Sequence, residues 1–146
     1  MRLVALRGQI VTDYEVWPDG TLLLGEGSIA DVSPDDSLVA EADEVHDHPE
    51  SLILPGFVDL QVNGAFGVDV ASEIARLPEL SEALLSTGTT SYLPTVISSP
   101  EGLYEEVLPA MGTATGSGAQ VLGVHLEGPF ISLEKRGAHA AAHVLM

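Results

Sequence analysis

The sequence predicts an α/β chain in two parts, a β-rich segment over residues 1–54 followed by three β/α units over residues 55–146. Two observations lead to this fold class. In the first part, short apolar runs alternate with Gly, Pro and Asp turn signals, which is typical of part of a small β-sandwich. In the second part, runs of strand length alternate with segments of helical periodicity, which is typical of a parallel sheet.

The first part contains three short apolar runs, at Leu3–Leu6, Thr21–Leu24 and Ser28–Val32. The turn signals Pro18-Asp19-Gly20 and Gly25-Glu26-Gly27 separate them. Gly and Pro interrupt regular structure at such positions, so we expect three separate short strands.

An H-x-H pair follows, His46 and His48 in the segment EVHDHPE. On a strand, residues two apart share a face, so the pair allows a metal site. The segment is acidic and no apolar strand closes the site, and these features favour two surface histidines. The role of the pair stays open.

The second part begins with a predicted strand, Phe57–Val62, that ends at the turn signal Asn63-Gly64. Alternation along this strand turns Asp59, Gln61 and Asn63 to one side, and we expect that side to face inward. A helix is predicted next, over Ser72–Ser86, because its leucines recur at spacings of three and four.

A second β/α unit follows Gly88, which suits a helix C-terminus. Thr89–Val96 is rich in β-branched and aromatic residues, so we expect a strand there. Ser98 or Ser99 is a candidate N-cap for a second helix, whose first turn contains a proline. That helix has the apolar stripe Leu103, Val107, Ala110 and Met111 and leads into the Gly-rich loop Gly112–Gly118.

A third strand is predicted over Val121–Glu127, with Gly123, His125 and Glu127 on one face. A carboxylate at the end of a buried strand is costly unless a partner compensates its charge. A metal ion is one such partner, and the nearby Arg136 is another.

The order β-α-β-α-β predicts a parallel sheet, either an open doubly wound sheet or the first part of an eight-stranded barrel. The segment Ala140–Met146 has the composition of the beginning of another helix and carries no stop signal. We therefore expect the chain to be truncated.

The formal net charge of −17, from 22 acidic and five basic residues, argues against binding to nucleic acid or anionic membrane. Two of the cations, Lys135 and Arg136, are adjacent, which indicates either an anionic ligand or a solvated loop. Without cysteine, a metal site would have to use His and carboxylate. No apolar run is as long as a membrane span and the N-terminus lacks a signal-peptide core, so we expect a soluble cytoplasmic protein.

Three segments of the chain are distinctive: ILPGFVDLQVNGAFGVDV, STGTTSYLPTVISSP and VLGVHLEGPFISLEKRGAH. In this order they resemble the N-terminal part of the N-acetylglucosamine-6-phosphate deacetylases, a branch of the amidohydrolase superfamily. The most specific part is H-L-E-G-P-F followed by K-R-G-A-H. The resemblance implies a metal-dependent hydrolase on a TIM barrel, the (β/α)8 fold, which removes acetate from N-acetylglucosamine 6-phosphate.

The resemblance also implies roles for residues near the third strand. Glu127 matches the family's metal-ligand glutamate, where a divalent ion would activate water and polarise the amide carbonyl. His139 matches the histidine that contacts the substrate amide, and Ala138 matches a neighbouring substrate contact. His125 shares a face with Glu127, so it could be a second metal ligand, an orienting partner or a hydrogen-bonded core histidine.

Gln61 and Asn63 stand where most amidohydrolases carry an H-x-H pair that binds one metal of two. Amides are poor zinc ligands compared with imidazole, so this departure puts a two-metal site in doubt. It resembles the deacetylases that use a single metal, and we expect one divalent ion, zinc or iron, per complete site.

The family's remaining metal ligands, its general base and its phosphate contacts lie on later strands, beyond Met146. We therefore expect the 146-residue chain alone to be inactive, and the complete enzyme to be a homo-oligomer acting on a small amino-sugar phosphate. Two alternatives remain: another N-acyl or cyclic-amide hydrolase of the superfamily, or a non-catalytic small α/β module.

Overall fold

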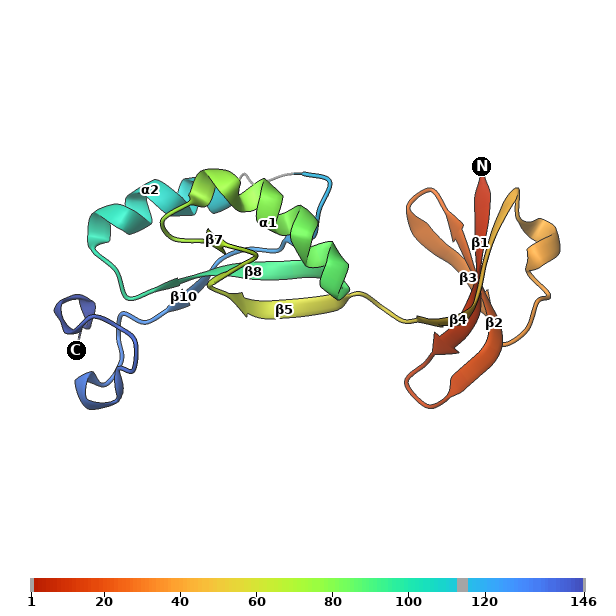
Figure 1. Ribbon diagram of the computed structural model, residues 1–146, viewed down its shortest axis with the longest axis horizontal. Coiled ribbons are helices and arrows are strands. Elements are labelled where there is room, and N and C mark those ends of the chain that lie inside the picture. The colour runs from red at the N-terminus through yellow and green to blue at the C-terminus, as the bar shows by residue number, and fades with distance from the viewer. Residues whose placement is uncertain (1, 113–115, 146) are drawn as a thin grey trace. The chain divides into compact units, whose positions relative to one another are not determined.

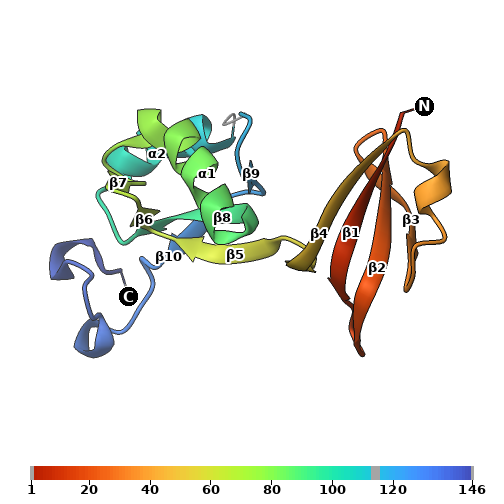
Figure 2. The same cartoon turned by 45° about the vertical axis from the view of Figure 1, so that its right-hand side comes forward.

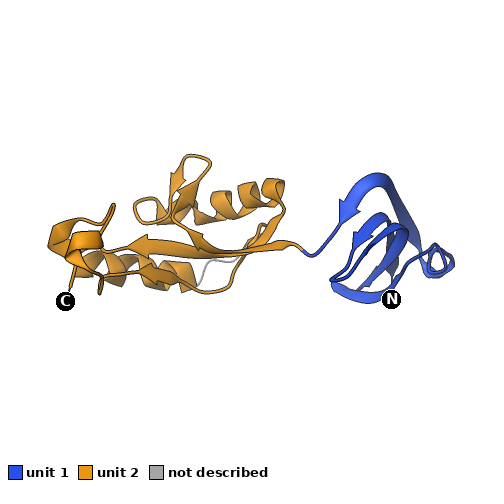
Figure 3. Cartoon of the chain, turned by 90° about the horizontal axis from the view of Figure 1, so that it is seen from below, with its two compact units in different colours: residues 1–55 blue, residues 56–146 orange. Residues whose placement is uncertain are grey.

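The computed structural model describes residues 2–112 and 116–145 and divides the chain into two compact units, residues 1–55 and 56–146 (Figure 3). Each unit has its own apolar core. Residues 113–115, within the predicted Gly-rich loop, lie outside the described residues.

The first unit is a four-stranded sheet, formed by β1 (Leu3–Val11), β2 (Val16–Gly25), β3 (Ser28–Ser33) and β4 (Glu44–Ile53). A 3₁₀ turn, η1 (Val39–Glu41), precedes β4. The strand order is β3-β2-β1-β4, with β4 parallel to β1 and the other neighbours antiparallel (Figure 1). The three predicted strands lie within β1, β2 and β3. The sequence does not predict β4, because its side chains are mostly exposed and show no apolar alternation.

The core of the first unit is small, with Ala5, Leu23 and Leu38 buried. A separate apolar hollow of about 260 Å³ includes Ile29, which is 65% exposed, and Trp17. A second sheet packed against this unit, as in a sandwich, stays a prediction.

The second unit is built on a parallel sheet of β5 (Phe57–Val62), β8 (Thr89–Ile97), β9 (Gln120–Val121) and β10 (His125–Glu127). Its order is β10-β8-β5, and β9 also pairs with β8. The parallel sheet expected from the β-α-β-α-β order is thereby confirmed. The short strands β6 (Gly64–Ala65) and β7 (Val68–Asp69) form a separate antiparallel pair.

The first helix is shorter than predicted. The regular helix α1 spans Leu77–Leu84, between the 3₁₀ turns η2 (Ile74–Arg76) and η3 (Leu85–Thr87). It begins late because its proline belongs in a first turn, where no amide donor is needed. Gly88 ends the segment with φ of +80°, as predicted.

Helix α2 (Glu101–Gly112) lies on the same face of the sheet as α1 (Figures 1 and 2). The core between helices and sheet consists mainly of leucine and valine from both helices and of Tyr92 and Val96 from β8. The predicted stripes supply it, because Leu77, Leu80 and Met111 are at most 1% exposed.

The third predicted strand is interrupted, and this part of the prediction is wrong. Instead of one strand over Val121–Glu127, β9 and β10 pair with β8 on either side of Pro94. Proline has no backbone N–H to donate to a ladder, so pairing at this point is weakened. The carboxyl end of the strand, with His125 and Glu127, is retained.

The segment predicted to begin another helix forms no regular α-helix over its described residues, 140–145. The chain makes the 3₁₀ turns η4 (Leu133–Lys135) and η5 (Ala141–His143), and then Leu145 donates its backbone N–H to the carbonyl of Pro129 at 2.8 Å. This bond holds the segment in extended contact with an earlier loop, where Phe130 and Leu145 form a bridge. None of the described helices is long and apolar enough to cross a membrane.

Candidate functional site

A pocket of about 620 Å³ lies at the carboxyl ends of β5, β8 and β10. Open parallel sheets and barrels both place their sites at this end of the strands. Five residues predicted for the site line the pocket: Gln61, Asn63, Glu127, Ala138 and His139. The other lining residues are Asp69, Ala71, Thr95, Ile97, Ile131, Lys135, Arg136 and Gly137.

Glu127 ends β10 and its side chain is 36% exposed. Its Oε2 accepts a hydrogen bond from Gln61 Nε2 at 2.8 Å, and its Oε1 lies 3.3 Å from His139 Nε2. The predicted alternative partner, Arg136, instead donates to the backbone carbonyl of His139 at 2.7 Å. Both contacts of the carboxylate are therefore with other predicted site residues.

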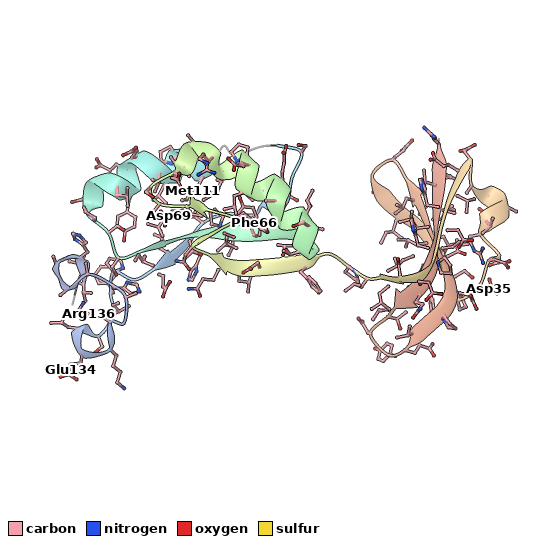
Figure 4. All side chains as sticks on the ribbon, in the orientation of Figure 1. Asp35, Phe66, Asp69, Met111, Glu134 and Arg136 are labelled. Atoms are coloured by element: carbon pink, nitrogen blue, oxygen red, sulfur yellow. The ribbon has the colours of Figure 1, made fainter. Side chains whose placement is uncertain are left out.

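His139 is almost completely buried, at 6% exposed. Its Nδ1 lies 2.8 Å from Ser98 Oγ and 3.2 Å from the backbone nitrogen of Ser98. The ring therefore spans the space between the end of β8 and Glu127. Residues 133–136, which precede it, carry the charged side chains of Glu134 and Arg136 (Figure 4).

His125 is placed differently from the other candidates. Its Nδ1 lies 3.2 Å from Thr95 Oγ1, on the neighbouring strand β8. It does not line the pocket among the described residues, although alternation along β10 puts it on the same face as Glu127. This contact is the kind expected of a hydrogen-bonded core histidine, one of its three predicted roles.

Asp69 is a pocket residue that the sequence does not single out. Hydrogen bonds from the hydroxyl and the backbone N–H of Ser72 hold the pKa of the Asp69 carboxyl below its usual value. The backbone N–H of Asp69 in turn donates to Glu73 at 3.0 Å. These bonds therefore favour the charged form of Asp69, which lines the pocket.

The sequence also does not predict the two hydroxyl residues that contact the histidines, Thr95 and Ser98. Ser98 and Thr95 are 3% and 1% exposed, and each contacts one imidazole. Helix α2 begins at Glu101, and the two serines predicted as candidates for its N-cap make other contacts: Ser98 contacts His139, and the Ser99 hydroxyl donates to the carbonyl of Ile97 at 2.8 Å. The available signal was the position of Ser98 directly after a strand, where parallel sheets gather polar groups.

Residues 2–112 and 116–145 contain no group of three or more His, Cys, Asp or Glu side chains that could hold a metal ion. The Glu127 carboxylate keeps oxygen lone pairs beyond its two contacts, so its chemistry fits the role of one metal ligand. His46 and His48 are both exposed on β4, with stacked rings 6.4 Å apart and His46 Nε2 3.0 Å from Glu44. Their exposure agrees with the surface interpretation.

Curated proteins are similar to this chain in sequence. The N-acetylglucosamine-6-phosphate deacetylase of Bos taurus is 42% identical over 95% of the chain, and that of Bacillus subtilis is 33% identical over 88%. The chain spans about a third of the length of these curated relatives (34% of each). No family model matches the chain.

Two solved structures extend the likeness to three dimensions. The crystal structure of N-acetylglucosamine-6-phosphate deacetylase from Pasteurella multocida superposes with a TM-score of 0.86 at 30% identity, over 98% of this chain and 38% of its own. A mutant deacetylase from Mycobacterium smegmatis, in complex with N-acetyl-D-glucosamine-6-phosphate, gives 0.79 at 20% identity, over 99% of this chain and 38% of its own. At 20% identity, the similarity to the Mycobacterium smegmatis deacetylase shows a shared fold alone.

Fold and pocket together define an α/β chain with a polar site at the carboxyl edge of a parallel sheet. Within that class, the chain is a homologue of the N-terminal third of the N-acetylglucosamine-6-phosphate deacetylases. The resemblance stated from the three sequence segments is therefore confirmed.

Proposed function

We propose that this chain supplies the N-terminal part of a metal-dependent deacetylase that removes acetate from N-acetylglucosamine 6-phosphate, leaving glucosamine 6-phosphate. The observation that carries the proposal is the convergence of Glu127, Gln61 and His139 in one pocket. These residues come from two strands and a loop far apart in the sequence, and each matches a family position.

The described residues supply one metal ligand that matches the family, which is fewer than a complete site needs. A catalytic zinc site takes about three protein ligands, and here Glu127 is the one candidate that matches the family. A divalent ion, zinc or iron, would polarise the amide carbonyl and lower the pKa of a bound water. The further ligands and the general base would come from residues outside this chain, so we expect no turnover by the chain alone.

Residues of this chain would bind and orient the substrate amide. Gln61 presents an N–H donor beside Glu127, and His139 Nε2 lies 3.3 Å from the same carboxylate; donors at this place would stabilise an oxyanion as it forms. Ala138 would offer backbone contacts. Lys135 and Arg136 line the same pocket and provide positive charge for an anionic substrate.

The arrangement of the second unit supports a barrel. Its strands pair in chain order and both helices lie on one face, as in successive units of a (β/α)8 barrel. A doubly wound sheet has helices on both faces. We further propose a cytoplasmic enzyme that acts as a homo-oligomer when complete.

A chimera tests the proposed function directly. In it, this chain replaces the corresponding N-terminal third of the Bos taurus deacetylase, and acetate release from N-acetylglucosamine 6-phosphate is measured with zinc or iron present. We expect turnover from the chimera and a loss of at least about 100-fold in kcat for Glu127→Ala, because the ion loses a protein ligand. The matched control is Glu134→Ala, which removes an exposed carboxylate from the same region.

A non-catalytic module is the competing function, and the absence of a three-ligand group among the described residues favours it. A folded chimera that binds metal but releases no acetate would support that alternative.

A further inference from the structure

Strand β4 carries Glu44, His46 and His48 on one face of the sheet in the first unit. Residues two apart on a strand share a face, and the pairing of β4 with β1 keeps one register from residue 44 to residue 48. β4 ends the strand order β3-β2-β1-β4, so no other described strand of that sheet lies beyond it. The two imidazoles therefore lie next to each other on an edge strand.

The side chains around the two imidazoles leave them open to solvent. The residues opposite them on β1 are Leu6 and Gly8, and Gly8 has no side chain that could cover His48. The His46 side chain is 46% exposed, and His48 is also exposed. An ion in solution can therefore reach both rings.

The two rings are almost parallel, with 5° between their planes and 6.4 Å between their centroids. Imidazoles that bind one zinc ion each place a nitrogen about 2.1 Å from it. Exposed side chains change rotamer within nanoseconds, so rotation about their side-chain bonds can bring one nitrogen of each ring to a shared ion. The spacing of His46 and His48 therefore suits a two-imidazole site.

Glu44 is the kind of partner that metal-ligating histidines usually have. Its Oε1 lies 3.0 Å from Nε2 of His46, and its other oxygen pairs with Arg2. A metal-ligating imidazole commonly has a carboxylate, a carbonyl or water on its second nitrogen. Within the part of the chain that the structure describes, no hydrogen bond or ion pair occupies Nδ1 of His46 or either ring nitrogen of His48. Both rings thus keep a nitrogen for an ion.

The surroundings of the pair carry an excess of negative charge. Residues 43–50 contain four carboxylates, and the two nearby cations are Arg2 and Arg7. These arginines pair with Glu44 and Asp47, and no ion pair among the described residues neutralises the other two carboxylates. A negative surface raises the local concentration of cations.

We propose that His46 and His48 form a surface chelate for one divalent transition-metal ion of the kind that binds imidazole, namely Cu²⁺, Ni²⁺ or Zn²⁺. The two imidazoles are the protein ligands, and water fills the remaining positions. This site is smaller than the groups of three or more ligands that residues 2–112 and 116–145 lack. Mg²⁺ and Ca²⁺ prefer oxygen ligands and do not compete for it. The inference concerns the first unit alone and does not depend on the proposed function.

The paramagnetic ion Ni²⁺ is a suitable probe, because it broadens the NMR signals of the groups that it binds. The sample is the untagged 146-residue chain with labelled histidine, in a large excess of Mg²⁺. His46→Gln and His48→Gln assign the two ring signals among those of the five histidines. We expect both signals to broaden together as Ni²⁺ is added, in spite of the Mg²⁺.

The single variants also test whether the two rings act together. In His46→Gln, the His48 signal should need at least about tenfold more Ni²⁺ to reach half of its broadening, because one imidazole then replaces a chelate. His48→Gln should affect the His46 signal in the same way. Glu50→Gln removes a carboxylate from the same strand but keeps both imidazoles, so it should change the Ni²⁺ requirement far less. His143→Gln removes a histidine from η5 in the second unit and should leave both signals unchanged.

Three results would overturn the inference. The first is that excess Mg²⁺ prevents the broadening of the His46 and His48 signals. The second is that the remaining ring in either single variant needs no more Ni²⁺ than in the unsubstituted chain, while the amide spectrum stays dispersed. The third is that Glu50→Gln has as large an effect as His46→Gln, since diffuse charge and not chelation would then hold the ion. If one histidine variant unfolds, the other decides.

Discussion

Gly118 lies where the chain passes over helix α1 before it enters β9. A Cβ at this position would lie 2.2 Å from the backbone carbon of Ser81, and the next residue, Ala119, donates its N–H to the carbonyl of Ser81 at 2.8 Å. Because the nearest atoms belong to the helix backbone, they cannot move away as a side chain could by changing its rotamer. We expect Gly118→Ala to lower the free energy of unfolding of the second unit by about 3 kcal/mol, measured by urea denaturation.

Gly116 offers the matched control for this substitution. It precedes Gly118 in the same loop, and a Cβ there meets no atom within 4 Å. Gly116→Ala should therefore change the free energy of unfolding by less than about 0.5 kcal/mol. Equal effects from the two substitutions would contradict the close approach of loop and helix.

The carboxyl of Asp69 is expected to titrate below its usual pKa of 3.8, because the hydroxyl and the N–H of Ser72 stabilise its charged form. Its contribution to stability is present above the ordinary pKa and is lost as the pH falls through the lowered value. Carboxyl NMR titration measures the midpoint directly. Ser72→Ala should move that midpoint upward, and an unchanged midpoint would contradict this cause.

At the scale of elements, α1 and β8 are joined by one buried hydrogen bond between Ser81 Oγ and Tyr92 OH, at 2.8 Å. Burial raises the pKa of the Tyr92 hydroxyl and so keeps the neutral form. Tyr92→Phe should lower the free energy of unfolding by about 1–3 kcal/mol, because Ser81 is left buried without its partner.

A double-mutant cycle isolates this bond. Ser81→Ala combined with Tyr92→Phe removes both polar partners, so the double variant should be more stable than the sum of the single effects predicts. Urea denaturation of the four proteins gives the coupling energy. A coupling energy within about 0.3 kcal/mol of zero would show that the contact does not link helix and strand.

The elements that the sequence predicts well are those whose apolar pattern persists over several turns or residues. The leucine stripe of α1 and the β-branched run of β8 lead directly to buried positions. The break between β9 and β10 could not be predicted from that segment, because its cause, Pro94, lies on the neighbouring strand. The segment before Met146 was misassigned for a related reason, since a tertiary bond to Pro129 holds it.

The residues of the candidate site also divide into those that local sequence predicts and those that depend on tertiary contacts. Glu127, Gln61 and Asn63 could be placed near the pocket, because the parity and the ends of strands are local properties. Ser98 and Asp69 could not, since their importance depends on partners that only folding brings close. The identification of Glu127 with a metal ligand depends on the resemblance to the family and remains a prediction.

At the scale of the whole molecule, strand β5 forms an edge of the parallel sheet with exposed apolar side chains. Leu60 is 64% exposed and Phe57 is 56% exposed. An edge of this kind can pair with another chain, so we expect concentration-dependent self-association in analytical ultracentrifugation. Leu60→Lys should weaken association about tenfold, whereas Leu85→Lys, which makes the same charge change in the 3₁₀ turn η3 and not in an edge strand, should not. A monomer at all concentrations, or equal effects from the two lysines, would show that this edge does not drive association.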